Sequence, residues 1–396
     1  MKTVSHVLFI TKEFQSEFQE NTGGTGVFYK NLTESLVGKN IRVSVFGSSK
    51  KPFIIENKKL SVLFVKDYFK KYKVMEFLRS ITGKISFLEN LHFKIYECEI
   101  KYLEKELLKF IDNKKIDIIE THDWEGISLI TDKLEIPCVI RCHGSWSVLR
   151  DFFGYGASKG KIHSEKRAFK KIDNIITISQ NNEKMVEQIF GKKDYHLIYN
   201  GIDTDFFKPQ KNASILEKSI FYLGNVSSEK GAETALNAFI KVNKSEKNST
   251  FHFIGKKTNL VNQLKERITL EKLDKKVYFH GKKNRNEVVQ LISQAEVVVF
   301  PSKGETFGLA LAEAMALEKP VLCSNLEAFR EIVSDKENGL IAKSEDEFAN
   351  NITQIFYDKL FAADLAKNAR KTIIEKFSSQ IMVQKTLEYY TEIINK

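Results

Sequence analysis

Short apolar runs alternate with longer amphipathic stretches along the whole chain, and few folds accommodate such a pattern. The runs consist largely of Val, Ile and Phe, as at 116–121 and 296–300, and turn residues bound them. Continuous runs of this kind are typical of strands buried on both faces of a sheet. Strands that alternate with helices form βαβ units, so the pattern predicts an α/β protein with parallel sheets.

The expected strands fall into two series. The first series comprises 7–11, 42–46, 60–65, 116–121, 137–141, 174–178 and 196–199. The second comprises 219–223, 250–254, 277–280, 296–300, 321–324 and 339–342. The expected helices between them include 27–39, 165–172, 231–243, 286–294, 309–317 and 328–333.

Two series of strands predict two Rossmann-like, doubly wound domains that face each other across a cleft. The segment 200–209 separates them: it opens with the turn signal Asn200-Gly201 and continues with Asp, Thr and Pro. We therefore place the first domain at residues 1–205 and the second at 206–377. The length of 396 residues suits two or three domains, and Gly (20) and Pro (5) are too scarce for a disordered chain.

The chain is basic, with 62 Lys and Arg against 51 Asp and Glu and a net charge of +11. Such an excess favours anionic membranes, polyanions or phosphate-bearing substrates, although no motif supports nucleic-acid binding. No apolar run is long enough for a signal peptide or a membrane span, so we expect a cytoplasmic protein. The four cysteines have irregular spacing, which predicts reduced thiols rather than disulfides or a zinc site.

The strongest motif is 301–316, PSKGETFGLALAEAMA, which follows an expected strand and opens a helix. Small residues at a helix start expose backbone N–H groups, and the helix dipole favours an anion there, which suits a diphosphate. Glu305 and Glu313 lie eight positions apart and could line one side of a pocket to bind sugar hydroxyls. Alternatively, Glu305 is an exposed loop residue and Glu313 a solvated helix residue.

The segment 222–231, YLGNVSSEKG, follows the first strand of the second domain, where doubly wound folds hold phosphates. Lys230 offers a positive charge for a diphosphate. The segment is neither a GxGxxG fingerprint nor a P-loop, which argues against NAD binding and NTP hydrolysis. An ordinary turn at Lys230-Gly231 is the alternative.

Two signals lie in the first domain. The loop 21–27 contains Gly23, Gly24 and Gly26 and opens a helix, so its backbone could approach a ligand closely, or it could be a flexible turn. His143 follows the expected strand 137–141 and would face the predicted cleft. A purely structural, hydrogen-bonded histidine is the alternative.

Together these motifs resemble the large retaining glycosyltransferase family 4, whose members have the GT-B fold. The resemblance covers nearly the whole chain, and its most specific part is 302–313 with Lys319-Pro320-Val321. Further similar segments are the Gly24 loop, His143-Gly144, 165–179, 199–209, Lys230-Gly231 and Phe377-Ser378. The resemblance implies that a closing helix crosses back to the first domain, so that residues 378–396 complete it.

The resemblance also implies residue roles. Lys230 and backbone N–H groups around Gly308 would bind the donor diphosphate, whereas Glu305 would bind the donor sugar. Glu313 would bind the ribose, the loop 281–286 would meet the nucleobase, and His143 would contact the sugar near the reacting centre. The candidate catalytic residues are therefore His143, Lys230 and Glu305. The candidate donor-binding residues are Gly23, Gly24, Asn225, Lys230, Glu305, Phe307, Gly308, Leu309 and Glu313.

The implied reaction is transfer from a nucleotide-diphosphate sugar, with a UDP-sugar favoured and GDP-mannose next. Preorganised cations and helix N–H groups would stabilise the charge on the leaving diphosphate, so neither a metal nor another cofactor is expected. One departure stands out, because the resemblance implies Arg after Gly224 and this chain has Asn225. Lys256 could replace the missing cation in part.

The acceptor is expected to be a bacterial surface glycan or a lipid-linked sugar. Residues 66–94 carry seven Lys and Arg against three acidic residues, with apolar side chains interleaved. They could form an amphipathic face for an anionic membrane, or a helical excursion whose apolar side packs on the domain. Asn225 leaves open a catalytically weak, sugar-nucleotide-binding partner protein. A GT-B-fold epimerase is a further alternative, and an oxidoreductase is more distant because no glycine fingerprint follows Ile10 or Leu223.

Overall fold

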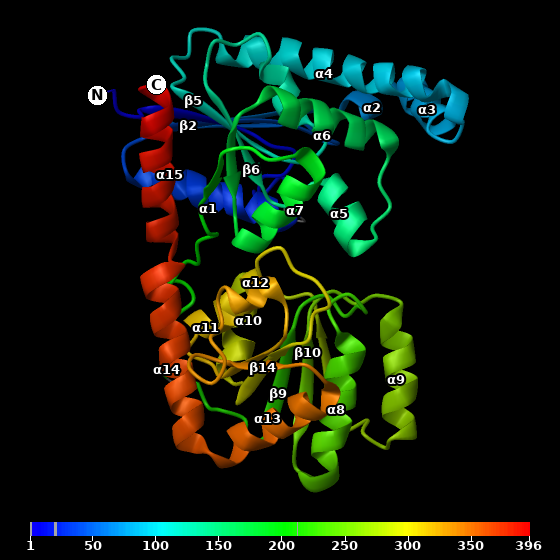
Figure 1. The fold of residues 1–396 in the computed structure, drawn as a ribbon, viewed down its shortest axis with the longest axis vertical. Helices are drawn as coiled ribbons and strands as arrows, with labels where there is room; N and C mark the ends of the chain where they lie inside the picture. Colours follow the sequence, from blue (N-terminus) through cyan, green and yellow to red (C-terminus); the bar gives the residue numbers. More distant parts are fainter. Residues whose placement is uncertain (1, 20–21, 212) are drawn as a thin grey trace. The chain divides into compact units, whose positions relative to one another are not determined.

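The chain folds into two α/β units, drawn as ribbons in Figure 1 from a computed structural model that describes residues 2–19, 22–211 and 213–396. Unit 1 contains Met1–Tyr199 and Val383–Lys396, and unit 2 contains Asn200–Met382. The sequence places the two boundaries after residues 205 and 377, a few residues from those of the structure. The sheet of unit 2 is parallel and that of unit 1 is parallel except at one edge, which confirms the predicted fold class.

Unit 1 is built on an eight-stranded sheet of order β3-β4-β2-β1-β5-β6-β7-β8. Within the described residues, neighbouring strands of this sheet run parallel except β3, which is antiparallel to β4. The strands are β1 (His6–Ile10), β2 (Arg42–Ser49), β3 (Phe53–Glu56), β4 (Leu60–Lys66), β5 (Ile118–His122), β6 (Cys138–Cys142), β7 (Asn174–Thr177) and β8 (Tyr195–Leu197). The strand order reverses between β1 and β5, whose carboxyl ends therefore flank a crevice suited to ligands.

Helices cover both faces of this sheet. They are α1 (Gly24–Gly38), α2 (Tyr68–Lys71), α3 (Lys73–Thr82), η1 (Ser86–Leu88), α4 (Glu89–Ile111), η2 (Ile127–Thr131), α5 (Trp146–Phe153), α6 (Lys159–Lys171) and α7 (Gln180–Phe190). On one face, Leu103 and Leu107 of α4 pack against Leu8 and Ile10 of β1. On the other face, Tyr29 of α1 packs against Phe9 of β1 with the two rings tilted and their centroids 5.2 Å apart.

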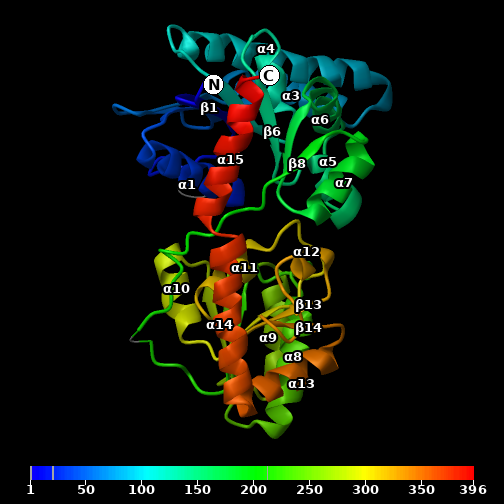
Figure 2. The same ribbon diagram turned by 60° about the vertical axis from the view of Figure 1, so that its left-hand side comes forward.

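The last helix, α15 (Ser379–Ile394), crosses from unit 2 to unit 1 and lies along the sheet of unit 1 (Figure 2). Glu120 and Arg141 are completely buried and form a bidentate ion pair with both N···O distances at 2.9 Å. Tyr390 donates a hydrogen bond to Glu120, and Arg141 donates one to Thr386. The buried pair thus reaches across the sheet to the helix that completes the unit.

Unit 2 contains a six-stranded parallel sheet of order β11-β10-β9-β12-β13-β14. Its strands are β9 (Ser219–Leu223), β10 (Thr250–Ile254), β11 (Val277–Gly281), β12 (Val297–Phe300), β13 (Val321–Ser324) and β14 (Leu340–Ala342). The helices are α8 (Ala232–Ser245), α9 (Leu260–Leu270), α10 (Arg285–Ser293), α11 (Leu309–Ala316), α12 (Glu327–Arg330), α13 (Glu345–Tyr357) and α14 (Lys359–Lys376). In chain order the strands run 3-2-1-4-5-6, the Rossmann arrangement.

Most expected elements agree with the structure to within a few residues, with two notable exceptions. The antiparallel edge strand β3 has no counterpart among the expected strands, because its short sequence includes exposed residues such as Ile54. The helix expected at 328–333 is shorter and ends at Arg330. No helix among the described residues is both long and apolar enough to cross a membrane.

Candidate functional site

The clearest candidate site in unit 2 lies where the strand order reverses, between β9 and β12. The loops that follow these two strands meet at Gly231, which has a positive φ of 69°. A Cβ at this position would lie 1.8 Å from the carbonyl oxygen of Pro301, so glycine is required for the close approach. Lys303 N–H also donates to the Glu229 carbonyl at 2.9 Å. The two loops are therefore held together by backbone contacts.

Lys230 and Glu305, one from each loop, form an ion pair at this point. The Lys230 ammonium lies 2.7 Å from Oε1 of Glu305, and the Ser302 hydroxyl donates to the same oxygen at 3.0 Å. The Lys230 side chain is one-third exposed, at 33%, whereas that of Glu305 is 18% exposed. A cation that is held in place and still reaches solvent can bind a phosphate, and a positioned carboxylate can accept hydrogen bonds from hydroxyls.

Tyr222 fixes the shape of the loop that carries Lys230. Tyr222 is buried on β9. Its hydroxyl is shared between two backbone carbonyl oxygens of the loop, that of Asn225 at 2.6 Å and that of Lys230 at 3.1 Å. Asn225 and Lys256 are both exposed beside this loop. The proposed compensation of the missing arginine by Lys256 stays a prediction.

The start of α11 supplies backbone donors next to the ion pair. Gly308 caps the helix with a φ of 109°, and a Cβ there would lie 2.8 Å from the Phe329 ring. Phe307 is buried, and its ring lies 5.9 Å from that of Phe377. The first N–H groups of a helix have no acceptor within the helix, so the turn beginning at Leu309 can bind an anion.

Glu313 lies one turn further along α11 with a half-buried side chain. Burial raises the pKa of Glu313 to about 7, and the positive charge of Arg285 opposes the rise. The carboxyl group is thus partly protonated near neutral pH and would gain from a hydrogen-bond donor on a ligand. Glu313 is therefore not the fully solvated helix residue that the sequence left as an alternative.

In unit 1, the predicted glycines lie at the start of α1. Gly23 is the N-cap residue, and its N–H donates to the Glu13 carboxylate at 3.0 Å. A Cβ on Gly24 would meet nothing within 4 Å, so this position is open. Asn21, also in the predicted loop, lies outside the described residues.

His143 follows β6 and packs against α1, with its ring 4.4 Å from that of Phe28. The backbone N–H groups of His143 and Gly144 donate to the carboxylate of Asp123, at 3.0 and 3.1 Å. Burial, reinforced by the charges of Arg141 and His122, holds the pKa of His143 well below its usual range, so the imidazole is neutral. Its buried Nε2 atom has no hydrogen-bond partner among the residues that the structure describes.

Asp123 and a neighbouring pocket are features of unit 1 that the sequence analysis did not identify. Burial and the charge of Glu165 raise the pKa of Asp123 to about 7, against the effect of the two N–H donors. The next two residues, Trp124 and Glu125, line a pocket of about 650 Å³ at the carboxyl ends of β1, β2, β4 and β5. Its charged lining residues are Lys12, Glu13, Lys50, Lys51, Asp67, Lys70, Glu76, Arg79, Glu99, Glu125 and Lys161.

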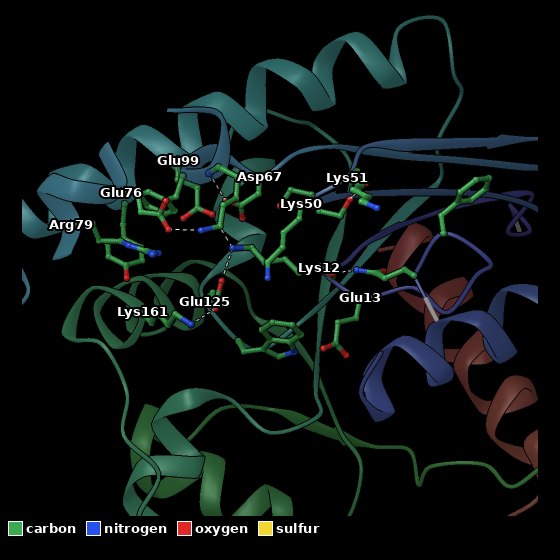
Figure 3. A pocket seen from close by; sticks show the side chains of 18 residues that line it. Lys12, Glu13, Lys50, Lys51, Asp67, Glu76, Arg79, Glu99, Glu125 and Lys161 are labelled. Carbon is green, nitrogen blue, oxygen red and sulfur yellow. Dashed lines mark hydrogen bonds and ion pairs between the residues drawn. The ribbon is translucent and has the colours of Figure 1, made fainter. Parts of the chain in front are cut away.

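Part of this lining is an ion-pair network that Figure 3 shows from close by. Lys12 bonds to Glu99 at 2.9 Å and to Glu125, which in turn pairs with Lys161. Burial disfavours charge on Glu125, but the two lysines outweigh it and lower the pKa of this carboxyl. Trp124 lies next to the network and adds an aromatic surface. A polar pocket with an aromatic wall can bind a sugar or a phosphate-bearing group.

The structure thus brings some predicted residues together and leaves others separate. Lys230, Glu305 and the start of α11 gather within unit 2, whereas Gly23, Gly24 and His143 belong to unit 1. Their assignment to one donor site stays a prediction. Within the described ranges, no group of three or more His, Cys, Asp or Glu side chains is arranged to hold a metal ion.

Two family models match adjoining parts of the chain. Residues 22–206 match Glycosyltransferase Family 4, and residues 203–372 match Glycosyl transferases group 1. An uncharacterized glycosyltransferase of Methanocaldococcus jannaschii is 27% identical over 320 residues, which cover 76% of this chain and 81% of the relative.

A second relative is the UDP-Gal:alpha-D-GlcNAc-diphosphoundecaprenol alpha-1,3-galactosyltransferase of Escherichia coli. It is 25% identical over 322 residues, 73% of this chain and 79% of the relative. The solved structure of Anabaena HepE in complex with UDP and glucose is similar in fold, with a TM-score of 0.71 and 18% identity over 97% of this chain and 99% of HepE.

The two family models together span most of the chain, and the solved structure repeats its two-sheet fold over nearly the full length. The protein therefore belongs to the GT-B-fold glycosyltransferases of group 1 and family 4.

Proposed function

We propose that the protein is a retaining glycosyltransferase that uses a nucleotide-diphosphate sugar as donor, with a UDP-sugar favoured and GDP-mannose next. The observation that carries the proposal is the Lys230–Glu305 ion pair at the start of α11, because it combines a phosphate-binding cation, a hydroxyl-binding carboxylate and helix N–H donors. The UDP and glucose bound by HepE and the UDP-Gal named for the E. coli relative support the choice of donor.

In the proposed reaction, the bond between the anomeric carbon and the diphosphate oxygen breaks while the acceptor oxygen attacks from the same face. The acceptor proton passes to an oxygen of the departing phosphate, so no strong protein base is needed. Lys230 and the N–H groups near Leu309 would stabilise the developing negative charge. We propose that these groups replace a metal ion and that the enzyme is metal-independent.

The remaining assignments concern positioning. Glu305 would accept hydrogen bonds from the donor sugar, Glu313 from the ribose, and Gly281–Asn286 would border the base. His143 is neutral, and its Nε2, which has no hydrogen-bond partner in the described part of the chain, could bind a sugar hydroxyl. The exposed Asn225, in place of an expected arginine, supports one second candidate, a catalytically weak protein that binds a sugar nucleotide for a partner enzyme.

We place the acceptor among glycans or lipid-linked sugars, in bacterial surface polysaccharide synthesis. The diphosphoundecaprenol acceptor in the name of the E. coli relative supports a lipid-linked substrate. We propose a cytoplasmic protein, held peripherally at the inner face of the membrane through residues 66–94.

The first test is a thermal-shift screen against UDP, GDP, ADP, CMP, NAD and several UDP- and GDP-sugars. A ligand at 100 times its dissociation constant stabilises the folded protein by about 2.7 kcal/mol, which gives a clear shift. We expect one nucleotide diphosphate and its sugars to respond, and the response to weaken in Lys230→Ala. Absence of any such response would overturn the donor assignment, and binding without turnover on any acceptor would favour the weak-partner alternative.

A further inference from the structure

The helix α3 presents large apolar side chains to solvent. Val74, Phe77, Leu78 and Ile81 follow helical spacing and share one face, and the exposed fractions of Val74 and Phe77 are 71% and 64%. The segment that follows adds exposed apolar residues, Phe87 at 86% and Leu91 at 44%. We call these six residues the docking face.

The helix does not need this face to hold its place in unit 1. Met75, on another side of α3, packs against a cluster that contains Tyr68, Phe69 and Ile95. At the end of α3, the Thr82 hydroxyl is hydrogen-bonded to Nδ1 of His92 in α4 at 2.9 Å. Other residues anchor the helix, so the docking face is not needed for its packing. Exposure of these apolar side chains to water is unfavourable and adds nothing to the stability of the fold.

Exposed basic residues flank the apolar residues of the docking face in sequence. Lys73, Lys84 and Lys94 are exposed and make no ion pair with any residue that the structure describes. The nearby carboxylates of Glu76 and Glu89 are paired with Lys70 and Lys159. The unpaired charge around the apolar face is therefore positive, which is complementary to anionic phospholipid headgroups.

We propose that the docking face binds an anionic lipid bilayer, with α3 lying in the plane of the interface. Apolar side chains on one face with lysines at its rim are the pattern of interfacial helices. A second copy of the chain is a poorer occupant. In a two-fold symmetric dimer this face would meet itself, and the lysines of both copies would be brought together.

The reverse side of the same helix faces the pocket of unit 1. Glu76 and Arg79 of α3 line that pocket, and they lie about half a helical turn away from Val74 and Ile81. Docking would thus hold the pocket roughly one helix diameter, about 10–12 Å, from the bilayer surface. This last step rests on the proposed transferase function, and it identifies the acceptor as a molecule carried by the membrane lipid.

The test is co-sedimentation of the full chain with sucrose-loaded vesicles of phosphatidylcholine, with or without about one-third phosphatidylglycerol. We expect binding to the anionic vesicles alone and a loss of binding at high salt. Val74→Ser/Phe77→Ser should lower the partition coefficient at least about tenfold, because two apolar side chains no longer leave water. Lys73→Gln/Lys84→Gln/Lys94→Gln should lower it on anionic vesicles.

The matched control is Leu270→Ser/Leu360→Ser, which removes two apolar side chains of unit 2 that are 79% and 82% exposed. This control should bind vesicles like the wild type. Equal binding by Val74→Ser/Phe77→Ser and the wild type would overturn the proposal. So would a wild-type dimer, measured by analytical ultracentrifugation, that the same double variant converts to monomers.

Nucleotide binding separates this proposal from the proposed function. The docking variants should keep the wild-type thermal shift with the donor nucleotide, because their substitutions lie in unit 1 and change none of the residues proposed to bind the donor, whereas Lys230 belongs to unit 2. Vesicle binding without any nucleotide response would support docking and contradict the donor assignment. A nucleotide response without vesicle binding would support the donor assignment and contradict docking.

Discussion

The ammonium nitrogen of Lys230 lies 2.7 Å from a carboxylate oxygen of Glu305, although 75 residues separate the two in sequence. The pair joins the loop after β9 to the loop after β12, and the Ser302 hydroxyl steadies the carboxylate. If Lys230 binds the donor diphosphate, the diphosphate competes with Glu305 for the same cation. The donor would then release the carboxylate for the sugar hydroxyls at the moment it binds.

Replacement of Lys230 by alanine should lower kcat by about 10²–10³, the loss typical of removing one group that stabilises charge in the transition state. Steady-state kinetics with the donor found in the nucleotide screen measures this effect. Lys241→Ala is the control, because Lys241 is a lysine of unit 2 that pairs with Asp346 at the surface. Undiminished turnover in Lys230→Ala would remove the phosphate role.

Glu305→Ala should weaken binding of the sugar part of the donor but not of its nucleotide part. Its affinity for the nucleotide-diphosphate sugar should fall at least about tenfold, because a hydrogen bond to a charged group is worth roughly 1.5–3 kcal/mol. Its affinity for the nucleotide diphosphate alone should stay equal or rise, since Lys230 loses a competing partner. Calorimetric titration with both ligands checks this, and an equal loss for both would argue against contact with the sugar.

Glu313 should make nucleotide binding depend on pH near neutrality. Its pKa of about 7 means that the carboxylate forms as pH rises through this value. A ribose hydroxyl donates better to the carboxylate, so the affinity should increase between about pH 6 and pH 8 and then level off. Glu313→Gln should weaken binding and flatten the profile, whereas the exposed control Glu337→Gln should leave it unchanged.

The same residue predicts a change in stability. A carboxyl whose pKa is raised in the folded state destabilises the fold as pH rises from its unfolded value of about 4.3 to about 7. Glu313→Gln should therefore raise Tm relative to the wild type at about pH 8 and much less at about pH 4. An equal change in Tm at both values would contradict the raised pKa.

Gly231→Ala should destabilise unit 2 and weaken nucleotide binding together. The added Cβ would lie 1.8 Å from the Pro301 carbonyl oxygen, so the two loops must separate. The control is Gly154→Ala, which has nearly the same φ, 71° against 69°, but open space around the Cβ. We expect the control to cost only about 1 kcal/mol of backbone strain and Gly231→Ala clearly more, measured by chemical denaturation.

Chelation should leave the rate unchanged, because Lys230 and the start of α11 are proposed to stabilise the diphosphate. The measurement is turnover before and after EDTA treatment, with added Mg²⁺ or Mn²⁺. Loss of turnover on chelation, with recovery on adding a divalent ion, would show that a metal performs this step and would contradict the proposal.

The strands β9, β12 and β13 of unit 2 could be located from sequence because they are apolar runs between turn residues, and burial on both faces leaves no polar alternation within them. Lys230 and Glu305 could each be singled out from their loops, since both loops follow strands at the point where the order reverses. Their direct contact could not be predicted, because it depends on the close approach of Gly231 to Pro301.

The polar network of unit 1 could not be predicted from the sequence for a similar reason. Lys12 and Glu125 are 113 residues apart, and nothing in either local sequence indicates the partner. Asp123 likewise looks like an ordinary residue after a strand until burial and the N–H groups of His143 and Gly144 are known. The basic and apolar character of residues 66–94 was visible, but not which of its side chains pack and which stay exposed.

The buried contact of Glu120 and Arg141 with Thr386 and Tyr390 has a consequence for biosynthesis. During translation, Met1–Tyr199 leaves the ribosome well before α15, because the whole of Asn200–Met382 is made in between. At roughly 5–20 residues per second this delay is about 10 to 40 s. Throughout that interval the nascent first unit lacks the helix that supplies Val383, Tyr390 and Ile393, so the apolar surface they cover and the Glu120–Arg141 pair are both open to water until α15 is made.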